Sequence, residues 1–196
     1  METNSTQRLT TTEYAVLGLL GFGESSGYDL ARAASRSIGY MWAPSRSQIY
    51  KVLPRLVGWG LAESREVEQR GRPDKAVYRI TDEGRRTLAA WIEHIEHEPS
   101  GGAGVFLLKL FFGEGASPAA AHAQLDAYRG QVERRLSEFQ EIEQGLQADE
   151  SPHTRAALRH GIVRARATLE WADETRRALE DAQGAGTARG ARPRNA

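Results

Sequence analysis

The sequence predicts a mostly α-helical protein that carries a β-hairpin in its first half and two long helices in its second half. Three observations support this fold class. Apolar residues recur at helical spacings through most of the chain. Residues 61–80 break that pattern, with two short strand-like runs on either side of a turn. Further along, helical patterns run through residues 121–146 and 158–179.

Composition and charge narrow the class of protein. The chain has 196 residues, enough for a small domain with a helical appendage. Basic and acidic residues number 26 each, so a DNA-binding interpretation has to depend on where the basic residues lie. The absence of cysteine excludes disulfides, thiolate nucleophiles and Cys-ligated zinc, and it fits a reducing cytoplasm.

Neither a membrane span nor a secretion signal is expected. No apolar run reaches the roughly 18 to 20 residues that a membrane-spanning helix needs. Residues 1–7 are polar and lack the apolar core of a signal peptide. We therefore expect a soluble protein that stays in the cytoplasm and has no membrane partner.

Two helices are expected before residue 40. Thr10 and Glu13 form a capping box that opens the first helix, after residues 1–8, which we expect to be disordered. Residues 14–20 are apolar on nearly every side, so this helix is expected to be buried. Glycines end it, and a second helix follows over residues 27–37.

The third helix has the clearest pattern. Pro44 and Ser45 start it, with Ser45 as the cap, and Gln48 completes a second capping box. Gly58 and Gly60 end it. Between these limits runs one apolar stripe with helical spacing, made of Ile49, Val52, Leu53, Leu56 and Val57.

A hairpin and a fourth helix complete the first half. Residues 61–68 and 75–80 are typical of strands, and the turn between them is rich in Gly, Pro and charge. Thr81 caps a fourth helix that is expected to reach about residue 96. Three helices followed by a two-stranded wing form a winged helix-turn-helix domain, whose third helix is the candidate for the major groove of DNA.

The second half predicts a helical dimerisation domain. After a linker over residues 98–102, residues 105–112 form a short apolar helix, and Pro118 and Pro152 each open a long one. The apolar residues of both long helices keep the spacing of a coiled-coil seam. Two such seams cannot both be buried in so small a chain without a partner, so we expect a homodimer.

These elements define the expected domain boundaries. The winged-helix domain spans residues 9–97, and the helical dimerisation domain spans residues 104–182. The remaining segment, residues 183–196, is rich in Gly, Ala and Arg and is expected to be disordered.

The third helix carries the strongest indication of function. Its first turn offers hydroxyl, amide and guanidinium groups, which can contact base edges and phosphates of DNA. The DNA-binding residues predicted here are Ser45, Arg46, Ser47, Gln48, Tyr50, Lys51 and Arg55. The alternative is a solvated helix face with ordinary caps. The position of the helix, third in a unit that ends in a hairpin, favours DNA binding.

The turn of the hairpin is the second indication of DNA binding. Arg70, Arg72 and Lys75 cluster around Gly71 and Pro73. A basic tip on a stiff hairpin suits contacts to phosphate, which position a protein on DNA without reading its sequence. The alternative is a solvated charged turn, which is common in hairpins.

Short motifs follow one another in a distinctive order along the first half. They are residues 14–20 (Tyr-Ala-Val-Leu-Gly-Leu-Leu), Ser26-Gly27-Tyr28-Asp29-Leu30, Pro44-Ser45 through Ile49-Tyr50, Gly60-Leu61, Gly71-Arg72-Pro73, Tyr78-Arg79-Ile80-Thr81 and Gly84. This ordered set resembles the PadR family. In the second half, residues 106–113 and Trp171 are similar to the helical region of that family, so the resemblance covers residues 9–182. It implies a ligand-responsive repressor that acts as a homodimer on an inverted repeat in double-stranded DNA.

The third helix departs from the family pattern. Family members commonly carry proline directly after the tyrosine and a basic residue three positions later, whereas this chain has Lys51 and Pro54 at those places. Val57 stands where the family has glutamate. A proline inside a helix removes one backbone hydrogen bond and tends to kink the helix.

Enzyme and metal chemistry have little support. His94 and His97 lie three apart at a helix end beside acidic residues, a spacing that would allow both to bind one metal ion. A charged helix terminus is the interpretation we favour. The sequence contains no Gly-rich phosphate loop and no nucleophile motif. We therefore expect no enzyme activity, no metal and no cofactor.

Aromatic residues suggest a small-molecule effector site between the two domains. The predicted ligand-binding residues are Trp42, Phe106, Tyr128 and Trp171, with Trp91 and Phe111 as further candidates. The alternative for most of these residues is ordinary core and dimer packing. For the whole protein, the competing class of function is a winged-helix module that binds other proteins without binding DNA directly.

Overall fold

The computed structural model of the chain describes residues 9–39, 41–42, 44–68, 75–95, 102–115, 117–147 and 150–190. Of residues 183–190 only the helical backbone is described. The chain forms two compact units. The first comprises Met1–His94 with Glu98–Ser117, and the second comprises Ile95–His97 with Pro118–Ala196.

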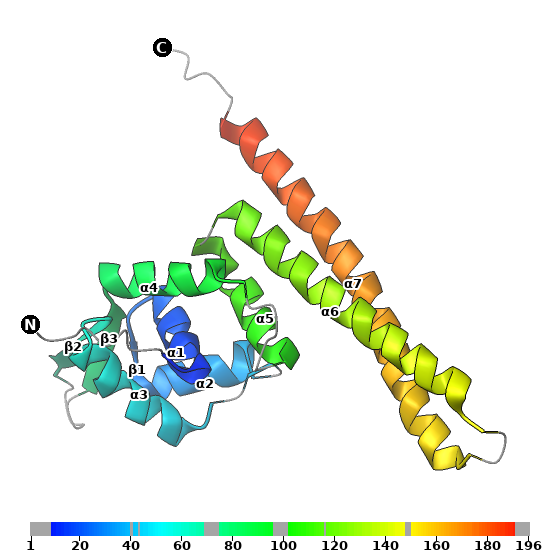
Figure 1. Ribbon diagram of the computed structural model, residues 1–196. Coiled ribbons are helices and arrows are strands. Elements are labelled where there is room, and N and C mark those ends of the chain that lie inside the picture. The colour runs from blue at the N-terminus through cyan, green and yellow to red at the C-terminus, as the bar shows by residue number, and fades with distance from the viewer. Residues whose placement is uncertain are drawn as a thin grey trace, which may run out of the picture. The chain divides into compact units, whose positions relative to one another are not determined.

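The first unit begins with three helices, as the sequence predicts. They are α1 (Thr11–Gly21), α2 (Gly27–Ser37) and α3 (Arg46–Gly58), shown in blue to cyan in Figure 1. Both predicted capping boxes are formed: the hydroxyl of Thr10 accepts from the Glu13 N–H, and that of Ser45 accepts from the Gln48 N–H. These caps satisfy backbone N–H groups that have no partner within the helix.

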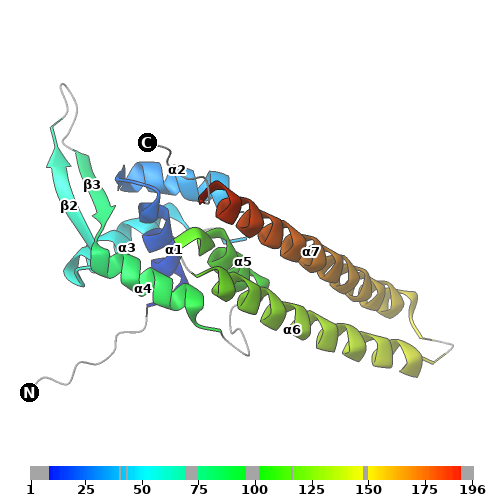
Figure 2. The same cartoon turned by 90° about the horizontal axis from the view of Figure 1, so that it is seen from above.

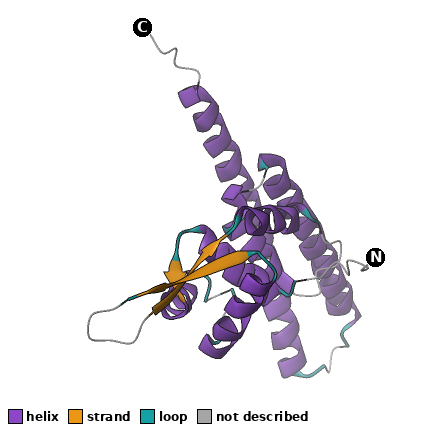
Figure 3. Ribbon diagram, turned by 90° about the vertical axis from the view of Figure 1, so that its left-hand side faces the viewer, coloured by secondary structure: helices purple, strands orange, loops and turns teal. Residues whose placement is uncertain are grey.

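The wing is a three-stranded antiparallel sheet in the order β1–β3–β2. The long strands β2 (Ala62–Val67) and β3 (Lys75–Ile80) form the expected hairpin, which Figure 2 and Figure 3 show from two sides. The third strand, β1 (Ser25–Ser26), pairs Ser25 with Tyr78. Sequence reasoning missed β1 because two residues are too short for a period-two pattern.

The fourth helix, α4 (Asp82–Glu93), begins at Thr81, whose side chain accepts from the Gly84 N–H. It ends before the expected residue 96 because His94 takes up an extended backbone. The short apolar helix α5 (Gly102–Phe111) and the 3-10 turn η1 (Gly113–Gly115) follow.

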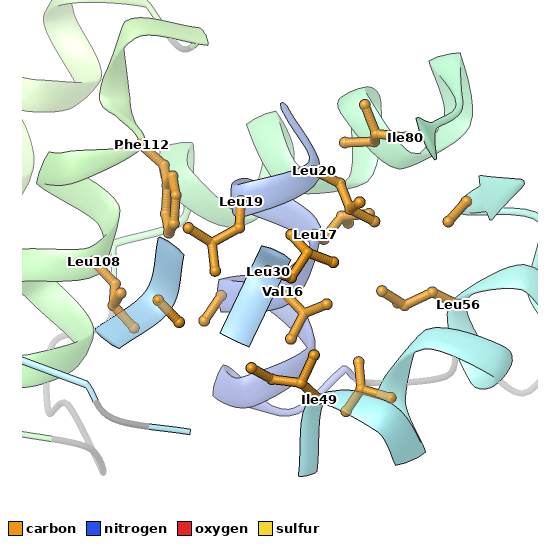
Figure 4. Close-up of a cluster of buried hydrophobic side chains, with 14 of the residues drawn as sticks. Val16, Leu17, Leu19, Leu20, Leu30, Ile49, Leu56, Ile80, Leu108 and Phe112 are labelled. Atoms are coloured by element: carbon orange, nitrogen blue, oxygen red, sulfur yellow. The ribbon is translucent and has the colours of Figure 1, made fainter. Parts of the chain in front are cut away.

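Helix α1 forms the centre of the first unit. Its residues Ala15, Val16, Leu17 and Leu20 are completely buried, as expected for a helix that is apolar all round. Figure 4 shows the surrounding cluster, which includes side chains from α2, α3, β3, α5 and the turn after α5: Leu30, Ile49, Leu56, Ile80, Leu108 and Phe112. Each such side chain contributes about 1.5–3 kcal/mol through burial.

Helix α5 belongs with the winged helix, which differs from the expected boundary at residue 104. Val105, Leu108 and Phe112 join the core that surrounds α1. The physical reason is the close approach of Phe112, the residue after α5, to Gly18 on α1: a Cβ placed at Gly18 would lie 2.7 Å from the Phe112 ring. The glycine thus leaves space for the aromatic side chain.

The second unit consists of two long helices, α6 (Pro118–Gly145) and α7 (Pro152–Gly190), which lie side by side and antiparallel (Figure 1). Gly161 on α7 receives the ring of Phe139 on α6, since a Cβ there would lie 2.9 Å from that ring. Arg176, which interrupts the apolar seam in the sequence, forms an ion pair with Asp126 of α6.

The end of the chain differs from expectation in part. Helix α7 continues to Gly190, whereas the sequence suggested that order ends near residue 182. The predicted disorder of residues 1–8 and 191–196 lies outside the described residues. In the part of the chain that the structure describes, no helix is both long and apolar enough to cross a membrane.

The contact between Gly18 and Phe112 gives a stability prediction. Gly18→Ala should lower the free energy of unfolding by about 1–3 kcal/mol, because the added methyl overlaps a buried ring. Gly21→Ala is the matched control on the same helix, where a Cβ meets no atom within 4 Å. That change should leave stability unchanged or raise it by up to about 1 kcal/mol. Urea denaturation measures both, and equal effects would contradict the packing described here.

Candidate nucleic-acid interface

The first turn of α3 presents polar groups at the surface. Ser45, Arg46, Ser47 and Gln48 are all exposed. The Ser45 and Ser47 hydroxyl oxygens lie 3.0 Å apart, and the Gln48 Oε1 accepts from the Ser45 N–H at 2.7 Å. The Gln48 side chain is therefore held by the cap, while its amide nitrogen can still donate elsewhere. A rigid, exposed helix start of this kind suits contacts to DNA.

Tyr50 and Lys51 lie further along the exposed face of α3. The ring of Tyr50 packs against Gly27 at the start of α2, where a Cβ would lie 2.8 Å from the Tyr50 Cε1 atom. Even so, Tyr50 remains 49% exposed. The glycine lets the first turn of α2 approach α3, which fixes the angle between the two helices of the helix-turn-helix motif.

Helix α2 adds basic residues that sequence reasoning missed. The guanidinium carbon of Arg46 lies 5.2 Å from the centre of the Tyr28 ring, a cation–π contact that joins the start of α3 to α2. Arg32 and Arg36 follow Tyr28 at spacings of four on α2, and both are exposed. That spacing was the available signal, because residues four apart share one face of a helix.

Pro54 lies inside α3 without ending it. The helix runs from Arg46 to Gly58 through the proline, which is exposed. Proline lacks the N–H that would bond to the carbonyl of Tyr50, so α3 forgoes that backbone hydrogen bond. Pro54, which stands where family members commonly have a basic residue, thus lies after the first turn of α3. It leaves the capped start of the helix intact.

Arg55 has a different environment from the one the sequence suggested. Its guanidinium forms an ion pair of 2.9 Å with Glu13 of α1, a carboxylate that is only 1% exposed. Arg55 also lies over the Trp59 ring at 4.8 Å. A buried carboxylate needs such a partner, since an unpaired buried charge is strongly unfavourable. These contacts favour a structural role for Arg55 over the predicted role in DNA binding.

Lys75, the described member of the basic wing cluster, is also engaged within the protein. Its Nζ lies 2.7 Å from the Asp29 Oδ2, which ties β3 to the first turn of α2. The hydrogen bond from Lys75, together with one from the Ser26 hydroxyl, lowers the pKa of the Asp29 carboxyl. The predicted phosphate contacts Arg70 and Arg72 lie outside the described residues.

The strands of the wing carry further ion pairs. Arg65 of β2 donates from its Nε to the Glu24 carboxylate at 3.1 Å. Arg79 of β3 pairs with Glu63, its cross-strand neighbour on β2. Both pairs are exposed, so each contributes little to stability. They do, however, offset the positive charge of the wing sheet.

The four predicted ligand residues are divided between the two units. Trp42 and Phe106 lie in the first unit, where Trp42 packs against the core and Phe106 is buried. Tyr128 of α6 and Trp171 of α7 lie in the second unit and contact each other edge to face, with ring centres 6.5 Å apart. Burial raises the pKa of the Tyr128 hydroxyl.

Of the two histidines with metal-ligand spacing in the sequence, the structure describes only His94. The carbonyl oxygen of His94 accepts a hydrogen bond of 2.5 Å from the buried Lys109 Nζ on α5. This bond gives a hydrogen-bond donor to a carbonyl group at the C-terminal end of α4. His97 lies outside the described residues.

The fold and the exposed start of α3 define a winged helix-turn-helix protein with a helical second unit. Comparison with known families agrees. Residues 16–90 match the PadR-like family of transcriptional regulators, and residues 105–180 match the family described as the C-terminal region of virulence activator alpha.

Individual relatives agree with this match. A probable transcriptional regulator of Mycobacterium tuberculosis is 34% identical over 183 residues, which cover 86% of this chain and 97% of that protein. The negative transcriptional regulator PadR of Bacillus subtilis is 32% identical over 143 residues, covering 71% and 77%. The chain belongs to the PadR-like family, and its class of function is transcriptional regulation.

Among solved structures, Bacillus subtilis PadR in complex with operator DNA is similar to this chain at 27% identity. The match covers 87% of this chain and 99% of that one, with a TM-score of 0.46.

The ion pair between Glu13 and Arg55 predicts which basic residue of α3 is structural. Arg55→Gln should lower the free energy of unfolding by about 1–3 kcal/mol, because the buried Glu13 carboxylate loses its cation. Lys51→Gln is the control on the exposed face of the same helix, and we expect a change within about 0.5 kcal/mol. If Arg55→Gln were fully stable in chemical denaturation but lost operator binding, the DNA-contact role would hold instead.

Proposed function

We propose that the protein is a sequence-specific repressor that binds an inverted repeat in double-stranded DNA as a homodimer. One observation carries this proposal: α3 starts with a capped, exposed turn of polar and basic side chains on a winged-helix scaffold. Membership of the PadR-like family and the 32% sequence identity to a negative transcriptional regulator support repression over activation. Acting on chromosomal DNA, the protein works in the cytoplasm and needs no enzyme activity.

Within this proposal the residues of the interface have separate roles. Ser47, Gln48 and Tyr50 face base edges in the major groove, where hydrogen bonds distinguish one base pair from another. Arg46 and Lys51 contact phosphates beside the groove. The wing residues Arg70, Arg72 and Lys75 hold the neighbouring backbone, with Lys75 exchanging its Asp29 partner for phosphate.

The second unit forms the proposed dimer. Ile142 of α6 and Val163 of α7 are 52% and 50% exposed in the single chain. Leu158 and Leu169 on α7 are half-buried. Covering such apolar surface is the driving force for association of helices. The dimer then sets the separation of the two copies of α3, which must be about 34 Å for half-sites one turn of DNA apart.

An effector completes the proposal. A small, flat molecule binds the protein at aromatic side chains, for which Trp42, Phe106, Tyr128 and Trp171 are the candidates, and it releases the DNA. Such a ligand can shift the equilibrium only by its difference in affinity for the DNA-bound and DNA-free forms. Ligand and DNA must therefore weaken each other by the same factor.

A gel-shift titration against promoter DNA at several salt concentrations tests the function directly. We expect binding of the DNA upstream of the gene itself, with an affinity that falls as salt rises. A protein-interaction module without direct DNA binding would show no salt-dependent shift on any sequence, and that result would refute the proposal.

The proposed split between groove and wing gives a mutational prediction. Ser47→Ala should weaken binding to the operator more than binding to random DNA, because in this proposal the hydroxyl contacts base edges. Arg72→Ala should weaken binding to both DNAs alike, and it should reduce the slope of log affinity against log salt concentration by about one. Fluorescence anisotropy on both duplexes measures the two effects. If Arg72→Ala weakened binding to the operator alone, the assigned roles would be reversed.

The dimer gives a second prediction. Changing Leu158 and Leu169 to Asp should yield monomers and abolish operator binding, because each monomer holds only one half-site. Light scattering at micromolar concentration, together with a gel shift, measures both effects. Changing the exposed Arg166 of the same helix to Asp serves as a control for added charge. A monomeric wild-type protein would contradict the architecture proposed here.

A further inference from the structure

Helix α5 packs closely against the α2–α3 turn, the segment between Ser37 and Arg46. A Cβ placed at Gly104, in the first turn of α5, would lie 2.9 Å from the Met41 carbonyl oxygen. It would also lie 3.4 Å from the Cε3 atom of the Trp42 ring. Both elements belong to the first unit. The glycine thus lets the backbone of α5 approach the backbone of the turn that leads into α3.

The closest atom to Gly104 belongs to the backbone of the turn. A separation of 2.9 Å is shorter than the roughly 3.5 Å at which atoms of two groups pack favourably. A crowded side chain can change rotamer, whereas a carbonyl oxygen moves only when its peptide unit moves. A methyl group at position 104 therefore has to displace the turn, or α5 has to move away from it.

Helix α5 is firmly held on its other sides. Val105 and Leu108 are buried in the core that surrounds α1. Phe112, directly after the helix, packs against Gly18 of α1. Moving α5 would open this core, and close-packed interiors resist such changes. The displacement caused by a larger residue at position 104 therefore falls mainly on the turn.

The turn is also tied to the end of α2. The backbone N–H groups of Met41 and Trp42 both donate to the Ile38 carbonyl oxygen, at 2.9 and 2.7 Å. Ile38 is the C-terminal cap of α2, and its side chain is completely buried. Hydrogen bonds to α2 hold the turn on one side, and packing against Gly104 holds it on the other. The turn therefore has two fixed supports.

The supported turn lies immediately before the polar start of α3. Trp42 precedes Ser45, the N-cap of α3, by three residues. The Ser45 side chain accepts from the Gln48 N–H, and its N–H donates to the Gln48 side chain, so the cap and the first turn form one connected group. A shift of the turn at Trp42 is therefore passed on to the exposed groups of the first turn of α3.

We propose that Gly104 and Trp42 are positioning residues for operator recognition: α5 seats the α2–α3 turn and so sets where the first turn of α3 lies. Neither side chain contacts DNA. Base-edge hydrogen bonds depend on the placement of their donors and acceptors, whereas phosphate contacts carry no sequence information. Loss of the seat therefore lowers sequence discrimination first. The inference rests on the proposed function because it assigns operator contacts to the start of α3.

Gly104→Ala tests the seat in fluorescence anisotropy with operator and random duplexes. We expect operator affinity to fall at least about fivefold while affinity for random DNA stays within about twofold. Gly58→Ala is the matched control, because a Cβ at that exposed end of α3 meets no atom within 4 Å. It should leave both affinities within about twofold. Equal weakening of both duplexes by Gly104→Ala would contradict a positioning role.

A second variant removes the other partner of the contact. Trp42→Leu keeps an apolar side chain and takes away the ring that packs on Gly104, so it should also reduce the ratio of operator to random affinity. Urea titration of each variant identifies conditions in which it is fully folded, and the affinities are compared there. Unchanged ratios in both Gly104→Ala and Trp42→Leu would overturn the proposal.

A double-mutant comparison separates positioning from general damage to the fold. In protein that already carries Ser47→Ala and Gln48→Ala, Gly104→Ala should change operator affinity by less than about twofold, because the groups that it displaces are already gone. A loss as large as in the wild-type background would mean that Gly104 acts through some other part of the protein, and it would refute the proposal.

Hydrogen exchange on the free protein tests the seat without DNA. Gly104→Ala should speed exchange of the Gln48 and Ile49 N–H groups, whose acceptors both belong to Ser45, and leave the amides of α4 unchanged. A wild-type protein that binds no operator would refute the proposed function, whereas this local change in exchange would still support the link from α5 to α3. Unchanged exchange at the start of α3 would count against the link itself.

Discussion

The complete burial of α1 is the constraint on which the first unit depends. A helix that is apolar on every side must be enclosed on every side, and the chain encloses it with α2, α3, α4, β3 and α5. The side of α3 that carries Ile49 and Leu56 is fixed by this core, which turns its polar first turn outward. The outward position of the polar first turn of α3 therefore follows from the packing of a helix that itself has no exposed apolar side chain between Ala15 and Leu20.

Charge pairing within the chain decides which basic residues remain for a polyanionic partner. Basic and acidic residues are equal in number, and in the first unit several arginines and one lysine already face carboxylates. Arg55 neutralises the buried Glu13, and Lys75 holds Asp29. The start of α3 and the outer face of α2 keep positive charge without such partners close by, as far as the described residues extend. A neutral protein can in this way present a local basic surface, which is what binding to phosphate requires.

The second unit shows the same division between packing and polar pairing. Gly161 admits the Phe139 ring between α6 and α7, while Asp126–Arg176 and Arg129–Asp173 link the helices at their other end. The arginine that interrupts the predicted seam is thus accommodated by an acidic residue on the neighbouring helix. In the observed register, these ion pairs place opposite charges next to each other on α6 and α7.

The sequence by itself determined the helices, their caps, the hairpin and the family, because caps, turns and periodicity are local properties of neighbouring residues. The capped start of α3 was predictable for the same reason. Contacts between distant residues were not: the pairing of Ser25 with Tyr78, the ion pair of Arg55 with Glu13, and the docking of Phe112 on Gly18 join positions with no local signal. Only the tertiary structure decided that α5 belongs with the winged helix, since this depends on which side chains meet in space.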